Sequence, residues 1–145
     1  MDIKEKRHRL PKEYYVGAIS VAFTLCLEGK SKAFIKPEIV KIFTDILTFV
    51  VTTGGCIVPV YCFMPNHQHL IITGSTCNSD VWKAIVKYKQ KTGFWMSVNE
   101  PEMKWQKDFY DHIIRTSENI TTQVRYILDN PGKERISFIL AGVSL

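Results

Sequence analysis

The segment 58–73 constrains the fold of this 145-residue chain more than any other. Two runs rich in Val, Ile, Phe and Tyr, 58–63 and 70–73, predict two β-strands. Between these runs stand His67 and His69, two residues apart. Because side chains alternate across a strand, both imidazoles are expected on one face of the sheet. Such a pair is either a structural pair or the beginning of a divalent-metal site.

Length, composition and charge favour a basic globular protein. The 145 residues predict a single domain, 1–145, whose residues 1–13 form an irregular basic arm. No run of about 18 apolar residues occurs, so no membrane span is expected. The charged N-terminus has no apolar signal segment, which predicts a cytoplasmic protein. The net charge of +5, from 19 Lys and Arg against 14 Asp and Glu, suits a nucleic-acid partner.

Hydrophobic periodicity and turn residues predict the other elements. In chain order the expected elements are a strand over Tyr14–Leu27, a helix from Pro37 to Gly54, the two strands already described, a helix capped by Ser79 that runs to about Val98, a strand over Phe109–Arg115, a helix from Thr116 or Ser117 to Asn130, and a short strand over 136–140. The order β-α-β-β-α-β, followed by a helix, predicts an α+β, ferredoxin-like (split βαβ) fold. Two helices are then expected on one face of a mainly antiparallel sheet.

The third predicted helix carries a tyrosine away from its apolar stripe. At 3.6 residues per turn, one side of the helix collects Ile120, Val124, Ile127 and Leu128. Tyr126 and Asn130 lie on the opposite side and, four residues apart, share one face. Tyr126 is either an ordinary exposed tyrosine or a phenolic nucleophile beside a carboxamide oxygen that can bind metal.

Three motifs resemble a known family. They are Met64-Pro65-Asn66-His67-Gln68-His69-Leu70, the stretch from Trp105 to Arg115 (WQKDFYDHIIR), and Arg125-Tyr126-Ile127-Leu128-Asp129-Asn130-Pro131. Together they closely resemble the REP-associated tyrosine transposases, a branch of the single-tyrosine HUH transposases of bacterial insertion sequences. The resemblance runs from about Arg9 to Arg135, and three motifs in the family's order are much more specific than any one of them.

The resemblance implies a role for each matching residue. His67 and His69 would bind a divalent metal, Mg²⁺ or Mn²⁺, and Tyr126 would be the catalytic tyrosine. Asn130 stands where relatives carry a glutamine, and would be a third metal ligand or a polar group near the site. The implied activity is metal-dependent nicking and strand transfer of single-stranded DNA, through a 5′-phosphotyrosine intermediate. The implied substrate is a short DNA hairpin with a neighbouring single-stranded cleavage site.

Other residues are candidates for contact with DNA. Lys83, Lys87 and Lys91 are spaced four apart, and form a basic stripe that is either solvated or in contact with phosphate. Arg115 and Arg125, in the second and third motifs, are expected to contact phosphate. Phe94, Trp95 and Trp105 either stack on unpaired bases or, as most aromatic residues do, pack in the core. Tyr110 and His112 are expected to support the structure, and Tyr110 is the second candidate for the nucleophile.

One residue departs from the family pattern. The middle position of the motif is normally hydrophobic, and here it is Gln68. Alternation places Gln68 on the face opposite the histidines, where a buried amide without a partner costs about 1–3 kcal/mol. Two other functions stay open: a hairpin-DNA-binding protein of this fold without cleavage activity, and a metal-dependent hydrolase in which Tyr126 is a surface residue. Monomer and domain-swapped homodimer are both compatible with the sequence.

Overall fold

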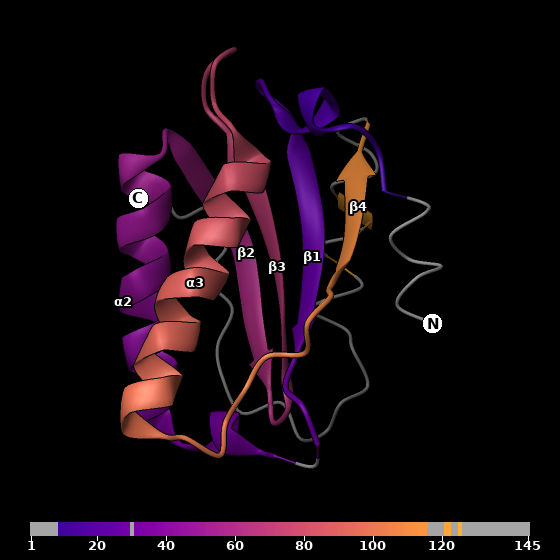
Figure 1. Cartoon of the computed structure of the whole chain (residues 1–145). Coiled ribbons are helices and arrows are strands. Elements are labelled where there is room, and N and C mark those ends of the chain that lie inside the picture. The colour runs from indigo at the N-terminus through magenta and orange to yellow at the C-terminus, as the bar shows by residue number, and fades with distance from the viewer. Residues whose placement is uncertain (1–8, 30, 116–120, 123–124, 126–145) are drawn as a thin grey trace.

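The computed structural model describes residues 9–29, 31–115, 121, 122 and 125 (Figure 1). Its strands are β1 (Ser20–Cys26), β2 (Cys56–Met64), β3 (His67–Gly74) and β4 (Tyr110–Ile114). They form one antiparallel sheet in the order β2-β3-β1-β4. Helices α2 (Pro37–Thr53) and α3 (Val81–Asn99) cover one face of this sheet (Figure 1). The predicted α+β, ferredoxin-like fold is confirmed, whereas the predicted helix that carries Tyr126 and the strand over 136–140 lie outside the described residues.

Helix α2 begins and ends where the sequence predicts. Pro37 occupies its first turn, where a missing N–H leaves no hydrogen bond unmade. The buried residues recur at helical spacing on the face toward the sheet, and they are Ile39, Phe43, Leu47, Val50 and Val51. At the other end Gly54 donates to the carbonyl of Val50 at 3.0 Å. Gly55 follows with a φ of 71°, a conformation that favours glycine and turns the chain directly into β2.

Helix α3 is capped by Asp80, so the predicted cap at Ser79 is wrong. The Oδ1 atom of Asp80 accepts a hydrogen bond from the backbone N–H of Lys83 at 2.9 Å. The Ser79 hydroxyl is turned inward instead and donates to the carbonyl of Gly55 at 2.6 Å. Ser79 therefore joins the beginning of α3 to the beginning of β2, while the neighbouring carboxylate caps the helix.

The predicted first strand is wrong at its N-terminal end, because β1 begins only at Ser20. Lys12–Tyr15 forms a 3₁₀ turn, η1, despite its two β-favouring tyrosines. Tyr15 is buried, and its ring lies 5.0 Å from that of Trp82 in α3. Its hydroxyl donates to Asp111 Oδ2 at 2.5 Å. These tertiary contacts outweigh the local strand propensity.

Arg9, within the predicted basic arm 1–13, is held against the folded body by side-chain contacts. Its Nε donates to Asp111 Oδ1 at 2.9 Å, and its Nη2 donates to the carbonyl of Phe109 at 2.7 Å. The guanidinium carbon lies 4.7 Å from the ring centre of Trp82 and 4.8 Å from that of Phe109. The arm is therefore anchored beside β4 at this residue, and residues 1–8 lie outside the described part of the chain.

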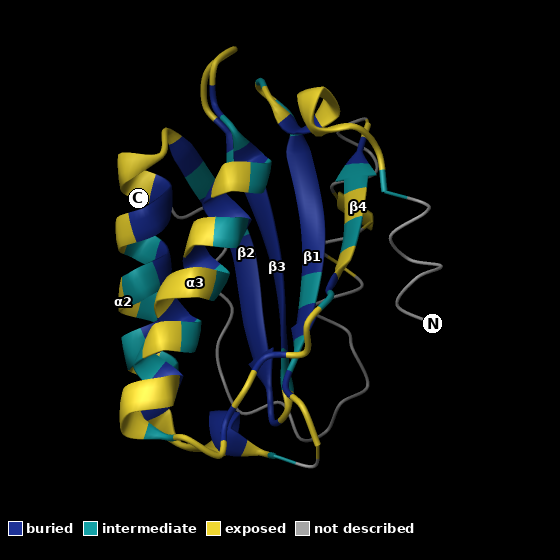
Figure 2. Cartoon of the chain, in the orientation of Figure 1, coloured by how far each residue is buried: buried dark blue, intermediate teal, exposed yellow. Residues whose placement is uncertain are grey.

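The strands are buried along most of their length (Figure 2), and buried apolar side chains form one cluster on each face of the sheet. The main core lies between the sheet and the two helices, and includes Trp105 and the partly buried Trp95. The core-packing interpretation is confirmed for these two residues, whereas Phe94 is 71% exposed on α3. The second, smaller cluster lies on the other face and consists of Ala22, Val60, Cys62, Met64, Ile71 and Ile114. None of the helices described is long and apolar enough to cross a membrane.

Candidate functional site

The two histidines lie side by side on β3, on the sheet face opposite α2 and α3. The residue between them, Gln68, points toward α3, so His67 and His69 share the other face, as the alternation predicts. Their ring centres are 4.8 Å apart, and the ring planes are almost perpendicular, at 88°. Throughout the text this side of the sheet is called the histidine face.

Each imidazole has a polar partner at Nδ1. The Nδ1 of His67 lies 2.8 Å from Asn66 Oδ1, and the Nδ1 of His69 lies 3.1 Å from Thr24 Oγ1 on β1. An amide oxygen only accepts, so the His67 contact requires a proton on Nδ1 and places the lone pair on Nε2. Partners of this kind orient histidine ligands at metal sites. The arrangement thus favours Nε2 as the metal-binding atom of the pair.

Burial keeps both imidazoles neutral near pH 7. Burial lowers the pKa of His67 below its ordinary value. Burial, with a further contribution from the charge of His67, lowers the pKa of His69 to about 4. A histidine binds metal only in its neutral form, so these shifts favour a ligand role.

The chemistry of the pair suits some divalent ions better than others. Imidazole nitrogen is a good ligand for transition metals, whereas Mg²⁺ prefers a shell of oxygen atoms. Two neutral imidazoles therefore fit Mn²⁺ well, and fit Mg²⁺ only if oxygen ligands complete the shell. Among the described residues no group of three His, Cys, Asp or Glu side chains is placed to hold a metal ion. The predicted third ligand, Asn130, and the predicted nucleophile, Tyr126, lie outside those residues.

Gln68 has a buried partner for its amide oxygen, whereas its Nε2 is buried without a hydrogen-bond partner among the described residues. It is fully buried on the helix side of β3, and its Oε1 accepts a 2.6 Å hydrogen bond from the hydroxyl of Tyr88 in α3. Burial strongly raises the pKa of Tyr88, so this phenol keeps the proton that it donates. The departure from the hydrophobic pattern therefore ties α3 to the strand that carries the histidines.

Three supporting residues were missed in the sequence: Thr24, Asn66 and Tyr88. Asn66 could have been found from its place directly before His67. Tyr88 could also have been predicted from the sequence, because it lies on the apolar stripe of α3, three residues after the buried Ile85. A phenol buried at such a position needs a polar partner. Thr24 could not have been predicted, because its contact with His69 depends on the register between β1 and β3.

Strand β4 adds two exposed side chains to the histidine face. Tyr110 pairs with Thr24 of β1, and Thr24 in turn pairs with His69 of β3, so the three residues form one row across the sheet. His112 lies two residues further along β4, opposite Ala22. Tyr110 is 56% exposed and His112 is exposed as well, so neither packs into the core.

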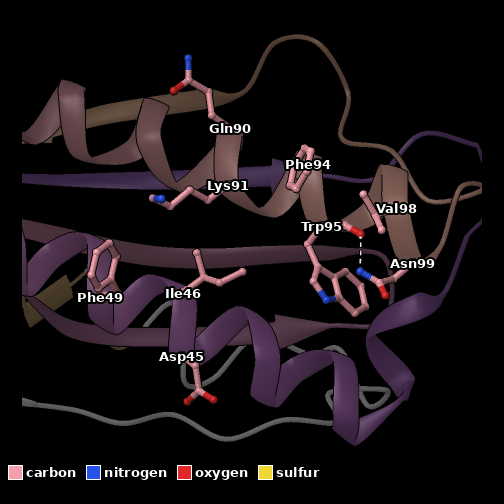
Figure 3. Close-up of a pocket in the computed structure, with 9 residues that line it drawn as sticks. All are labelled: Asp45, Ile46, Phe49, Gln90, Lys91, Phe94, Trp95, Val98 and Asn99. Carbon is pink, nitrogen blue, oxygen red and sulfur yellow. Dashed lines mark hydrogen bonds between the residues drawn. The ribbon is translucent and has the colours of Figure 1, made fainter.

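The predicted lysine stripe lies on the other side of the molecule. Lys83, Lys87 and Lys91 are all exposed on α3, which covers the sheet face opposite the histidines. Lys91 lines a groove of about 710 Å³ between α2 and α3, together with Phe49, Phe94 and other residues (Figure 3). Its Nζ lies 5.3 Å from the ring centre of Phe49. The metal and lysine parts of the predicted site are thus separated by the sheet.

The two predicted arginines are also exposed. Arg115 directly follows β4, and Arg125 is a described residue in helical conformation. Arg115 is therefore accessible at the end of the strand that carries Tyr110 and His112. Exposure of both side chains is compatible with contact to a polyanion.

The fold and the histidine pair are typical of a class of DNA-processing proteins. Comparison of the chain with models of known protein families identifies the family. The family model for IS200-like transposases matches residues 15–130. The chain therefore belongs to the IS200-like transposase family, as the three motifs predict, and its function lies in DNA transposition. No curated protein matches the sequence significantly.

Two solved structures share the fold. One is a REP-associated tyrosine transposase bound to a REP hairpin, with a TM-score of 0.71 and 20% identity, over 89% of this chain and 76% of that one. The other is a protein of Deinococcus radiodurans R1 described as a transposase, with a TM-score of 0.57 and 17% identity, over 80% of this chain and 92% of that one. At these identities the similarity establishes the fold.

Proposed function

We propose that this chain cuts and rejoins single-stranded DNA beside a hairpin, through a covalent phosphotyrosine intermediate. The main support for this proposal is the pair of neutral imidazoles on β3. Their ring centres are 4.8 Å apart, and each ring has a polar partner at Nδ1. Membership of a transposase family gives this pair a phosphodiester substrate.

His67 and His69 would hold a divalent metal through Nε2, with Asn130 as the proposed third protein ligand. When bound, the metal would polarise the scissile phosphate and offset the charge that develops there. Thr24 and Asn66 would fix the two rings through their Nδ1 atoms. Mn²⁺ or Mg²⁺ is the proposed ion, and the donor set favours Mn²⁺.

Tyr126 is the proposed nucleophile. Its hydroxyl loses a proton, and its oxygen forms a bond to phosphorus while the bond from phosphorus to the 3′ oxygen breaks. The products are a 5′-phosphotyrosyl link and a free 3′-hydroxyl, which takes up a proton. Because the covalent link preserves the phosphodiester energy, a new 3′-hydroxyl can reverse the step and join the strand to a different end.

The proposed substrate is a hairpin with a single-stranded cleavage site beside it. The related REP-associated transposase is described as bound to a REP hairpin, which supports this class of substrate. Arg115, Arg125 and the lysines of α3 would contact its phosphates. Binding should then weaken steeply as salt is raised.

Covalent trapping tests the proposal. The full chain is incubated with Mn²⁺ or Mg²⁺ and labelled hairpin DNA from its own genomic flanks, and DNA-linked protein is resolved on a denaturing gel. Both Tyr126→Phe and His67→Ala should abolish the linked band, while Tyr14→Phe, at an exposed tyrosine in η1, should retain it.

Each other result points to a different function. Hairpin binding without a covalent band in any metal would favour a DNA-binding protein without cleavage activity. Cleaved DNA without a covalent band would favour a hydrolase. A band that survives Tyr126→Phe but is lost in Tyr110→Phe would move the nucleophile to β4.

A further inference from the structure

Tyr110 combines exposure with a position on the histidine face. Of the exposed large apolar side chains in the described part of the chain, Tyr110 alone belongs to a strand. The others lie in the N-terminal segment, in η2 (Ala33–Ile35) or on the helices. An aromatic ring that is 56% exposed contributes little to the core. Its place in the row with Thr24 and His69 puts it where a DNA strand bound at the histidines could reach it.

The distance between Tyr110 and His69 across the sheet limits which groups the Tyr110 side chain can reach. Tyr110 and His69 are two strands apart, and two strand spacings are about 9–10 Å. Side chains of one row stand roughly perpendicular to the sheet, so their tips stay about as far apart as their backbones. An attacking oxygen must come within about 3–3.5 Å of the phosphorus. This spacing favours contact of the Tyr110 ring with a neighbouring nucleotide over attack of its hydroxyl on a phosphate held at the histidines.

We propose that Tyr110, with His112 beside it, forms a stacking platform for unpaired bases of the DNA strand that crosses the histidine face. Every base has a flat face, and aromatic side chains bind single strands by stacking on it. Aromatic residues on adjacent strands of a four-stranded sheet bind unpaired bases in this way in RNA-recognition domains. This inference rests on the proposed single-stranded substrate, and adds how its bases are held.

His112 extends the platform along β4. It is exposed and lies on the same face as Tyr110, two residues away, which is about 7 Å along a strand. Arg115 follows at the end of β4 and is exposed, so it supplies a charge for the backbone of the same DNA strand. The platform thus runs parallel to β3 and faces the histidine pair across β1.

Binding of an unstructured oligonucleotide in EDTA tests the platform without metal or cleavage. The probe is a labelled oligodeoxythymidylate, whose bases stack weakly on one another, and its dissociation constant is measured by fluorescence anisotropy. Tyr110→Ala should weaken binding about 5- to 100-fold, the size expected for one lost stacked base. Tyr110→Phe keeps the ring and should stay within about twofold of the wild type, and His112→Ala should also weaken binding.

Tyr14→Ala is the matched control. Tyr14 is 55% exposed, almost as much as Tyr110, but it lies in η1 and its loss should leave binding unchanged. A fluorescent 2-aminopurine in the oligonucleotide gives a second measurement, because stacking quenches it in the wild type and in Tyr110→Phe but not in Tyr110→Ala. Circular dichroism confirms that each variant is folded.

The outcomes separate this inference from the proposed function. Wild-type affinity in Tyr110→Ala, or an equal loss in Tyr14→Ala, overturns the platform and leaves the metal and tyrosine chemistry intact. Loss of the covalent band in Tyr110→Phe, with binding retained, overturns it by making Tyr110 the nucleophile. No binding of single-stranded DNA by the wild type overturns the platform and the proposed substrate together.

Discussion

The hydroxyl of Tyr88 donates a 2.6 Å hydrogen bond to Oε1 of Gln68, directly behind the histidine pair. Both side chains are fully buried, and the bond joins α3 to β3. The polar residue between the two histidines is therefore a fixed part of the core. Tyr88 supports the strand from the face opposite the histidines.

Removal of the Tyr88 hydroxyl should destabilise the protein. In Tyr88→Phe the amide of Gln68 loses its donor inside the core, at a cost of about 1–3 kcal/mol in the free energy of unfolding. Urea denaturation measures this difference. The double variant Tyr88→Phe with Gln68→Leu restores a hydrophobic middle position and should recover most of the loss, because two apolar partners leave no polar group unpaired. Equal stability of Tyr88→Phe and wild type would contradict the role assigned to the bond.

The elements of the fold were predictable where the signal is local. The apolar spacing of α2 and the alternation around His67 and His69 depend only on neighbouring residues, and both were predicted correctly. The 3₁₀ turn at Tyr15 was not, because the bond that holds it reaches Asp111, 96 residues away in the sequence. The cap at Asp80 was missed because Ser79 has an equally suitable side chain, and only tertiary contact with Gly55 draws it inward.

In the candidate site, too, the features set by neighbouring residues were predictable and those set by tertiary contacts were not. The alternation of β3 predicted that both imidazoles share a face, but the partner of His69 depends on the register of β1. The lysines of α3 lie away from the histidines because α3 packs on the opposite face of the sheet. A single sequence states the order of the elements, but not which face of the sheet each helix covers.

High pH should weaken the anchor of η1. Burial, together with the neighbouring Asp111, raises the pKa of Tyr15 to about 12, from the value near 10 expected in the unfolded chain. The unfolded state therefore releases its proton first, so the contribution of Tyr15 to stability is complete below pH 10 and is lost as the pH rises to about 12. Urea denaturation at pH 9 and pH 11 should show a smaller decline in Tyr15→Phe than in the wild type. An equal decline in both would assign the pH dependence to other groups.

The Nδ1 partner of His69 should tune metal binding. Thr24→Val keeps the shape of the side chain but removes the hydroxyl that lies 3.1 Å from His69 Nδ1. Losses of such supporting partners typically cost about 10- to 100-fold in metal affinity. Calorimetric titration with Mn²⁺ measures the loss. Thr73→Val is the matched control, because Thr73, on β3, likewise forms a hydrogen bond between β1 and β3, to Ser20 at 2.7 Å, but its bond is not to a histidine. Equal Mn²⁺ affinity in the two variants would show that Thr24 does not orient the ring.

The lysine stripe on α3 should contribute to DNA affinity without affecting the metal site. Lys83, Lys87 and Lys91 are exposed on the side of the sheet opposite the histidines. If each contacts a phosphate of a hairpin stem, replacing all three by Gln should lower the slope of log affinity against log salt by about 2 to 3. Anisotropy with labelled hairpin DNA at several salt concentrations measures that slope, and titration with Mn²⁺ should give the wild-type affinity. Lys41→Gln on α2 is the control, because Lys41 is paired with Asp45 at 3.1 Å and lies outside the stripe. A triple variant with the wild-type slope would show that the stripe is a solvated surface and that the hairpin binds elsewhere.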